Sequence, residues 1–155
     1  MSLMLSYQKA IRAARAAGRE VGLSAVPSPA AGKSLLAERQ RDALVASGLA
    51  EDLEALHGVV SIDRKIAIKR DTLIPKYAGY VARLREEGRP HELIGYFLVW
   101  LFDCGLIERA LDLADWCAGH GQGLPERFKS PLPAFVARQI LDWSQQTFDE
   151  GASPE

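Results

Sequence analysis

The segment HELIGYFLVWLFDC, from His91 to Cys104, constrains the fold more than any other part of the sequence. From Leu93 to Phe102 nearly every side chain is apolar, so a helix built from this segment has almost no polar face. The segment falls well short of the roughly 20 apolar residues that a bilayer-spanning helix needs. Such a helix is buried on every side, either at the centre of its own domain or against neighbouring subunits. As candidate contacts of an oligomer interface we assign four of its bulky side chains, Phe97, Trp100, Leu101 and Phe102.

Amphipathic helices are predicted for most of the remaining chain. Apolar residues recur at intervals of three and four, glycine and proline separate the segments, and β-branched residues never cluster as they do in strands. Pro75 lies inside one of these patterns and is expected to kink or divide its helix near Thr72, because proline removes a backbone hydrogen bond. The pattern therefore predicts an all-α fold of bundled helices and helical hairpins. The expected helices are Leu5–Gly18, Ser34–Leu56 with a division at Gly48, Ser61–Gly88, Leu106–Ala118 and Pro131–Gly151.

The same pattern divides the chain into four parts. Residues 1–22 form a basic N-terminal helix, expected to be an arm that contacts DNA. Residues 23–33 form a linker, since this stretch is rich in proline, alanine and serine. Residues 34–148 form a helical core and oligomerisation domain, and residues 149–155 form a disordered tail.

Charge is distributed unevenly along the chain, although the net charge is only −1. Residues 1–48 carry seven basic and three acidic side chains, whereas residues 91–155 carry four basic and ten acidic ones. This asymmetry suggests that one end of the chain meets phosphate and the other meets protein. Two cysteines are too few for a disulfide framework, and the first residues lack the order of a secretory signal, so a reducing compartment is expected.

Two clusters of cations are candidate DNA contacts, because neutralising phosphates needs several cations on one face. The first cluster shares one side of the N-terminal helix and consists of Lys9, Arg12, Arg15 and Arg19. Solvent or an anionic membrane surface would suit this face as well. The second cluster follows Ser61 and consists of Arg64, Lys65, Lys69 and Arg70. Asp63 and Asp71 lie among these residues, so ion pairs within the chain are the alternative there.

No catalytic, cofactor or metal site is predicted. The stretch AGKS (Ala31–Ser34) ends like a phosphate-binding loop, but Pro27 stands where that loop needs a glycine and no strand precedes it. Three residues are possible zinc ligands, namely Cys104, Cys117 and His120. Only Cys117 and His120 form a close pair, whereas a zinc site needs a second one. Four carboxylates crowd one hairpin, where a solvated acidic face explains them better than the metals of a nuclease, and these are Asp103, Glu108, Asp112 and Asp115.

Three stretches carry a resemblance to a known family. They are KRDTLIPKYAGYV (Lys69–Val81), LVWLFDCGLIERALDLADWCAGHG (Leu98–Gly121) and GLPERFKSPLPAFVARQI (Gly123–Ile140). In these stretches the chain resembles the small terminase subunits of cos-cutting temperate phages. The resemblance implies a protein that recognises viral DNA, delivers it to the large terminase subunit with its ATPase and nuclease, and forms a ring. Longer relatives continue with a basic tail, so the N-terminal cations are expected to carry more of the DNA contact here.

We therefore expect a non-enzymatic DNA-packaging subunit in the host cytoplasm. Its expected partners are double-stranded viral DNA, the large terminase subunit and further copies of itself, with no cofactor and no membrane. The main alternative is a helical adaptor that docks proteins through its ALDLADW hairpin (Ala110–Trp116) and does not bind nucleic acid. Some family members are labelled endonuclease subunits, so a protein that cuts DNA by itself is the third hypothesis.

Overall fold

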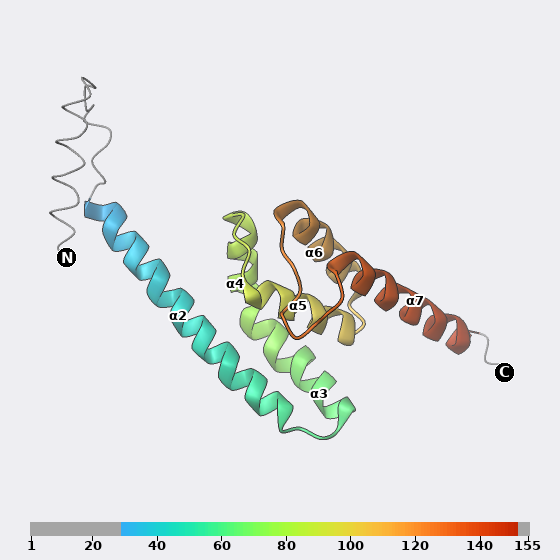
Figure 1. The fold of residues 1–155 in the computed structure, drawn as a ribbon. Coiled ribbons are helices and arrows are strands. Elements are labelled where there is room, and N and C mark those ends of the chain that lie inside the picture. The colour runs from blue at the N-terminus through green and yellow to red at the C-terminus, as the bar shows by residue number, and fades with distance from the viewer. Residues whose placement is uncertain (1–28, 152–155) are drawn as a thin grey trace. The chain divides into compact units, whose positions relative to one another are not determined.

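The computed structural model describes residues 29–151, and every regular element in this range is helical (Figure 1). The all-α fold class is thereby confirmed. The elements are the α-helices α2 (Pro29–His57), α3 (Ile62–Ile68), α4 (Ile74–Glu86), α5 (Glu92–Asp103), α6 (Ile107–His120) and α7 (Leu132–Gly151), and the π-helical turn η2 (Lys69–Leu73). None of these helices is long and apolar enough to cross a membrane.

Helix α2 differs from its prediction at two points. It runs without interruption across Gly48, because a single glycine costs a helix only about 1 kcal/mol relative to alanine. It also begins at Pro29, so residues 29–33 of the expected linker are helical. The expected N-terminal helix and the rest of the linker lie outside the described residues. Contacts within the chain divide it between Val45 and Ala46, and the packing described below is that of the unit beginning at Ala46.

Helix α5 forms the core of this unit. Its residues from Leu93 to Phe102 are all buried, and α4, η2 and α6 pack around them (Figure 1). The side chains that we assigned to an oligomer interface are only 1% to 6% exposed within the single chain, and these are Phe97, Trp100, Leu101 and Phe102. The chain itself therefore provides most of the burial that an apolar helix needs. Phe97 and Leu101 also line a pocket between α4, α5 and α6, and the assignment of these side chains to an oligomer interface stays a prediction.

The helix after Ser61 is divided close to the predicted position. In η2 the backbone N–H of Ile74 donates to Lys69 O, five residues back, and α4 then begins with Pro75 in its first turn. The wider turn accommodates a proline that has no N–H to donate and whose ring would crowd the preceding turn of an α-helix. Helix α4 ends before Gly88, whose φ of 64° requires the left-handed conformation that glycine adopts most easily.

Helices α5 and α6 form the expected hairpin around Gly105, which has a φ of 71°. Leu113 belongs to the buried stripe of α6, whereas Leu111 is 39% exposed. On the other side of α5, Gly95 lies against the loop after α6. A Cβ atom at Gly95 would lie 2.8 Å from Pro125 Cδ, so this position admits no larger residue without a shift of the loop.

A hydrogen-bonded cluster joins the end of α2 to α4. Asp52 Oδ2 accepts bonds from the Tyr77 hydroxyl at 2.5 Å and from Lys76 Nζ at 2.7 Å. Burial and then the bond to Asp52 raise the pKa of Tyr77 above its ordinary value. Burial also raises the pKa of Asp52, but the bonds from Lys76 and Tyr77 outweigh this effect and leave its pKa lowered. The pair therefore stabilises the packing of α2 on α4 as phenol and carboxylate.

Helix α7 packs on the core only through its first half. Phe135 lies edge-on between Phe102 of α5 and Phe128 of the preceding loop. From Leu141 to Gly151 every residue is exposed, and Figure 1 shows these turns extending beyond α5 and α6. The helix includes residues 149–151, the first part of the expected disordered tail, while residues 152–155 lie outside the described range.

Candidate nucleic-acid interface

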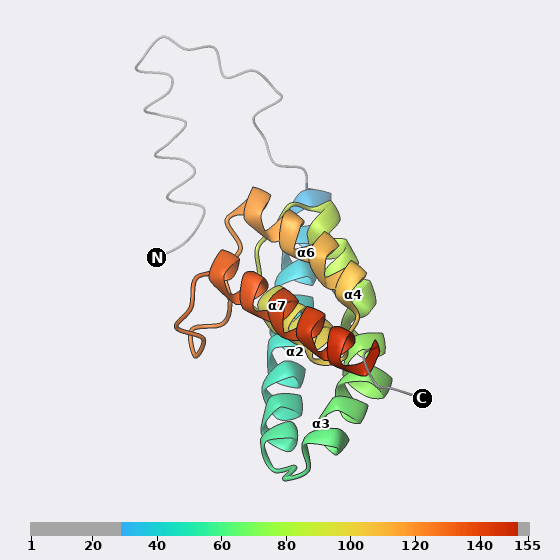
Figure 2. The ribbon, with the colours of Figure 1, turned by 90° about the vertical axis from the view of Figure 1, so that its right-hand side faces the viewer.

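The second cluster of predicted cations lies on α3 and η2, and a cap at Ser61 fixes where this segment begins. Ser61 Oγ accepts a hydrogen bond from the backbone N–H of Arg64 at 3.3 Å. Asp63 in the first turn complements the positive end of the helix dipole. The last turns of α2 run beside α3 (Figures 1 and 2). Arg64 and Lys65 are therefore presented from a capped helix that is supported on one side.

A groove of about 160 Å³ lies beside this helix. Its cations come from two places in the chain, since the continuous α3–η2 segment supplies Lys65 and Lys69 and the loop after α6 supplies Arg127. The remaining lining residues are Leu53, Leu56 and His57 of α2 and Tyr96, Val99 and Trp100 of α5. We call this feature the basic groove. It brings together two predicted DNA-contacting residues and one that the sequence analysis did not identify.

Ion pairs within the chain take up part of the predicted cluster, as the alternative interpretation expected. Lys69 Nζ lies 2.7 Å from Asp103 Oδ2, and the Lys69 side chain is only 15% exposed. Arg70 contacts Asp71 through two hydrogen bonds of 3.0 and 3.2 Å, in a pair that is open to solvent. Exposed pairs of this kind are weak, so Arg70 is able to exchange its partner for a phosphate. No such pair involves Arg64 or Lys65 among residues 29–151.

Arg127 is the cation that the sequence analysis missed. Its guanidinium carbon lies 4.9 Å from the centre of the Phe128 ring and 5.9 Å from that of Tyr96. These contacts hold the side chain beside α5, although more than 50 residues separate it from the cations of α3 in the sequence. Arg127 lies in a loop without periodic apolar residues, so only its tertiary contacts reveal that it belongs to this cluster.

The chemistry of the basic groove favours contacts with phosphate over contacts with bases. Tyr96 and Trp100 line it, but they are only 9% and 2% exposed, so neither ring offers a face on which a base could stack. Lys65 is partly exposed and Arg127 is exposed, so a phosphate backbone can reach both donors. The groove is thus suited to a DNA backbone rather than to an unstacked single strand. The four predicted cations of the N-terminal helix lie outside the described residues, and these are Lys9, Arg12, Arg15 and Arg19.

The acidic residues of the α5–α6 hairpin are dispersed. Asp103 is paired with Lys69, and Asp112 lies 2.9 Å from Arg85 Nη1. Within the described residues, no three His, Cys, Asp or Glu side chains lie close enough to hold a metal ion. Glu108 and Asp115 are exposed, and neither belongs to a group that could hold a metal ion within residues 29–151.

The two cysteines belong to the packed interior of the hairpin. Burial raises the pKa of Cys117 to about 11, which keeps its thiol protonated at neutral pH. Cys104 is half-buried, and its Sγ donates a weak hydrogen bond to Ile66 O at 3.7 Å. His120 stacks on Trp116 with ring centres 4.1 Å apart. Each of the three side chains considered as zinc ligands therefore has its own packing contact.

Comparison with known proteins shows that most of the chain matches one family. Residues 46–155, which include α3 to α7 and the basic groove, match the phage small terminase subunit family. Over 115 residues the chain is 31% identical to a protein of Haemophilus phage HP1 named "Probable terminase, endonuclease subunit". This match covers 73% of the chain and 41% of that relative, so the chain spans less than half the relative's length. No solved structure is significantly similar to the chain.

Proposed function

The chain belongs to the phage small terminase subunit family, and from this premise we propose that it binds the double-stranded DNA of its phage and delivers it to the large terminase subunit. Membership in this family supports a role in packaging phage DNA. In the proposed mechanism the protein acts in the host cytoplasm as a ring of identical subunits. It holds the DNA by its phosphates and leaves ATP hydrolysis and DNA cutting to the large subunit.

The observation that carries the proposal is the basic groove. Two segments far apart in the sequence converge on it. The continuous α3–η2 segment contributes Lys65 and Lys69, and the loop after α6 contributes Arg127. Lys69 is held by Asp103, so we assign it the role of positioning the wall of the groove. Lys65 and Arg127 are the proposed phosphate contacts, with exposed Arg64 and Arg70 beside them on α3 and η2. These contacts hold the DNA in place without reading its sequence.

Self-association would raise the affinity for DNA above what the few phosphate contacts of one subunit provide. A subunit that neutralises a few phosphates binds DNA weakly and loses affinity as salt is added. In a ring, the contacts of one subunit keep the DNA close to the groove of the next, so avidity increases without any new contact per subunit. The N-terminal cations Lys9, Arg12, Arg15 and Arg19 are proposed to extend the same phosphate contacts.

The test is a double substitution in the basic groove. We expect Lys65→Ala with Arg127→Ala to weaken binding to duplex DNA from the phage genome. The slope of log K against log salt should also fall by roughly 2, at about 0.9 for each lost phosphate contact. The matched control is Lys129→Ala with Arg138→Ala, which removes the same charge from exposed positions that do not line the groove. Equal affinity and slope in the groove variant and the unmodified protein would remove the groove from the mechanism.

The N-terminal arm is tested separately. Replacing Lys9, Arg12, Arg15 and Arg19 together by alanine is expected to lower both affinity and salt slope further, on top of the groove variant. If the four-residue variant binds DNA as the unmodified protein does at two salt concentrations, the arm makes no phosphate contact. If neither the groove variant nor the four-residue variant changes DNA binding, the result favours the helical adaptor that docks other proteins.

Intrinsic DNA cutting is the second candidate, because the name of the phage HP1 relative includes an endonuclease subunit. It predicts that the purified chain nicks DNA in a metal-dependent way and loses this activity on Asp112→Asn or Asp115→Asn. The ion pair of Asp112 with Arg85 opposes a metal-binding role, since the guanidinium already neutralises the carboxylate. Cutting that survives both substitutions would come from other residues or from a contaminant.

A further inference from the structure

The distal half of α7 carries a second apolar surface that its own chain does not cover. The first surface of the helix faces the core and includes Phe135. Leu141 and Phe148, seven residues apart, share the opposite side and are 65% and 75% exposed. Residues 139–151 also contain three acidic side chains and no basic one. The acidic residues are Asp142, Asp149 and Glu150. We call the segment Leu141–Gly151 the acidic tail helix.

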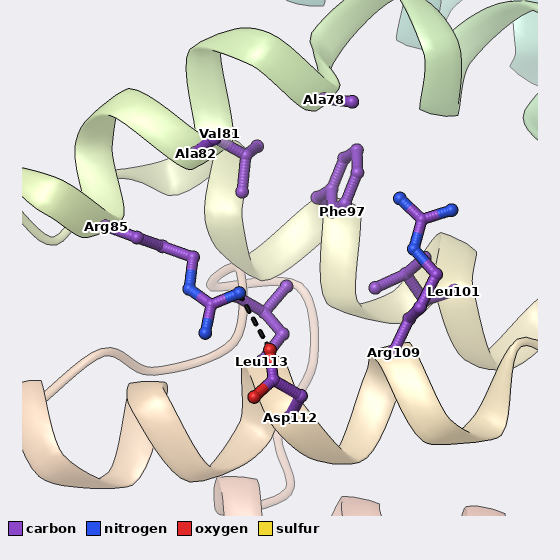
Figure 3. Close-up of a pocket in the computed structure, with 9 residues that line it drawn as sticks. All are labelled: Ala78, Val81, Ala82, Arg85, Phe97, Leu101, Arg109, Asp112 and Leu113. Atoms are coloured by element: carbon purple, nitrogen blue, oxygen red, sulfur yellow. Dashed lines mark ion pairs between the residues drawn. The ribbon is translucent and has the colours of Figure 1, made fainter.

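A pocket of matching character lies between α4, α5 and α6 (Figure 3). Its volume is about 170 Å³, below the roughly 300–1,000 Å³ of typical small-molecule sites, so its size suits one large side chain. Its apolar surface comes from Val81, Phe97, Leu101 and Leu113. Arg85 of α4 and Arg109 of α6 lie on opposite sides of it in Figure 3. We call this feature the two-arginine pocket.

The two arginines of the pocket differ in whether they form an ion pair. Arg85 Nη1 lies 2.9 Å from Asp112 Oδ2, as the dashed line in Figure 3 shows. Among the described residues, no carboxylate makes an ion pair with Arg109. The pocket therefore combines an apolar interior with a guanidinium that has an available charge. A partner that fits it has a large apolar side chain followed closely by carboxylates.

From this match we propose that the acidic tail helix of one copy docks in the two-arginine pocket of the next copy. Phe148 enters the apolar interior, and Asp149 and Glu150 lie beside Arg109. The proposal rests on the self-association included in the proposed function and assigns the two surfaces that carry it. Aromatic side chains and arginine are the residue types most often found at the energetic centre of protein interfaces.

A second copy is the occupant because the same chain cannot fill its own pocket. Phe148 is 75% exposed on a continuous helix whose first half is anchored at Phe135, so reaching the pocket would require breaking that helix. The two surfaces differ, which makes the contact head-to-tail. A contact of this kind leaves a free pocket at one end and a free tail at the other, so it repeats from copy to copy. The copies form a ring where the rotation between neighbours closes, and an open filament where it does not.

The experiment uses two single variants of the full chain and their mixture, with native mass as the measurement. Phe148→Ala removes the anchor, and Arg109→Glu reverses the charge of the pocket. Each is expected to weaken self-association by roughly 30-fold, the loss typical of a hot-spot residue, and to yield mainly monomer. Mixing the two variants should restore a dimer and nothing larger, because one intact tail then meets one intact pocket.

Matched controls separate this contact from general effects of the substitutions. Ser144→Ala changes an exposed residue of the same helix, and Lys129→Glu reverses the charge of an exposed cation outside both the pocket and the basic groove. Both should keep the mass of the unmodified protein. Restoration of the oligomer in Arg109→Glu by adding Asp149→Arg and Glu150→Arg supports the direct charge contact. Circular dichroism confirms that each variant remains helical.

Three outcomes overturn the proposal. A twofold α7–α7 contact would respond to Phe148→Ala, would ignore Arg109→Glu and would give no dimer on mixing. An oligomer unchanged by either variant would place the interface elsewhere and leave the proposed function intact. A protein that is monomeric with and without DNA would exclude both this contact and the ring, whereas the salt dependence of the groove variants would still decide whether a single subunit binds DNA.

Discussion

Helices α5 and α7 both carry bulky apolar side chains, yet their surroundings are opposite. In α5 all residues from Leu93 to Phe102 are buried, whereas no residue of α7 is fully buried. The difference arises from where the apolar residues lie on each helix. Around α5 they cover all sides and are enclosed by α4, η2 and α6. On α7 they form two opposite surfaces, of which the core covers one.

This contrast shows which kind of helix leaves a surface for a partner. A helix that is apolar on every side is buried within its own chain and leaves little side-chain surface exposed. A helix that is moderately apolar and has acidic residues beside its second surface remains soluble while that surface is exposed. The larger exposed apolar surface is therefore on α7, while α5 contributes only the part of Phe97 and Leu101 that lines the two-arginine pocket.

The largest expected effect comes from truncating a core side chain of α5. Trp100 is 2% exposed and contacts Tyr77, Tyr96 and Phe97, so Trp100→Ala should lower the free energy of unfolding by about 3–5 kcal/mol. Phe148→Ala on α7 should stay within about 0.5 kcal/mol, because its ring is exposed. Denaturant unfolding of dilute, monomeric protein measures both. Similar losses in the two variants would abolish the distinction between the helices.

A smaller effect is expected where the two helices meet. Phe135→Ala removes the ring that packs between Phe102 and Phe128 and should destabilise the protein by about 2 kcal/mol. The loss should be local, so amide hydrogen exchange should accelerate along α7 while α5 keeps its protection. Equal acceleration in both helices would show that α7 and the core unfold as one unit.

The smallest effect concerns the link between α2 and α4 on the far side of the core. Tyr77→Phe removes the hydroxyl that donates to Asp52, at a cost of about 1 kcal/mol measured at neutral pH. Burial and the bond to Asp52 raise the pKa of Tyr77 in the folded state. This contribution to stability is thus complete below the unfolded pKa of about 10 and is lost as pH rises through the folded value.

The pH dependence provides an internal check on that link. The stability difference between the unmodified protein and Tyr77→Phe should shrink in alkaline solution above about pH 10. Asp52 has a lowered pKa in the folded state, so its contribution is present above its ordinary pKa of 3.8 and is lost as pH falls further. A difference that stays constant from neutral to alkaline pH would show that the hydroxyl bond adds nothing.

Much of the helical framework could be predicted because its signals are local. The cap at Ser61, the break before Pro75 and the turn at Gly105 each follow from the backbone chemistry of a few neighbouring residues. The prediction of a division at Gly48 was wrong, because the cost of one glycine is small beside the rest of a long helix. For the candidate site, the sequence predicted Lys65 and Lys69 but not Arg127, whose loop carries no local signal.

The sequence by itself determined the helical class, most helix boundaries and the burial of the segment around Trp100, since hydrophobic periodicity and capping act over a few residues. Only the tertiary structure decided that Trp100 is covered by its own chain, that Arg127 joins Lys65 across the basic groove, and that Asp103 neutralises Lys69. It also decided that Phe148 stays exposed. These outcomes depend on which surfaces meet when helices pack, and contacts between residues far apart in sequence leave no mark in local periodicity.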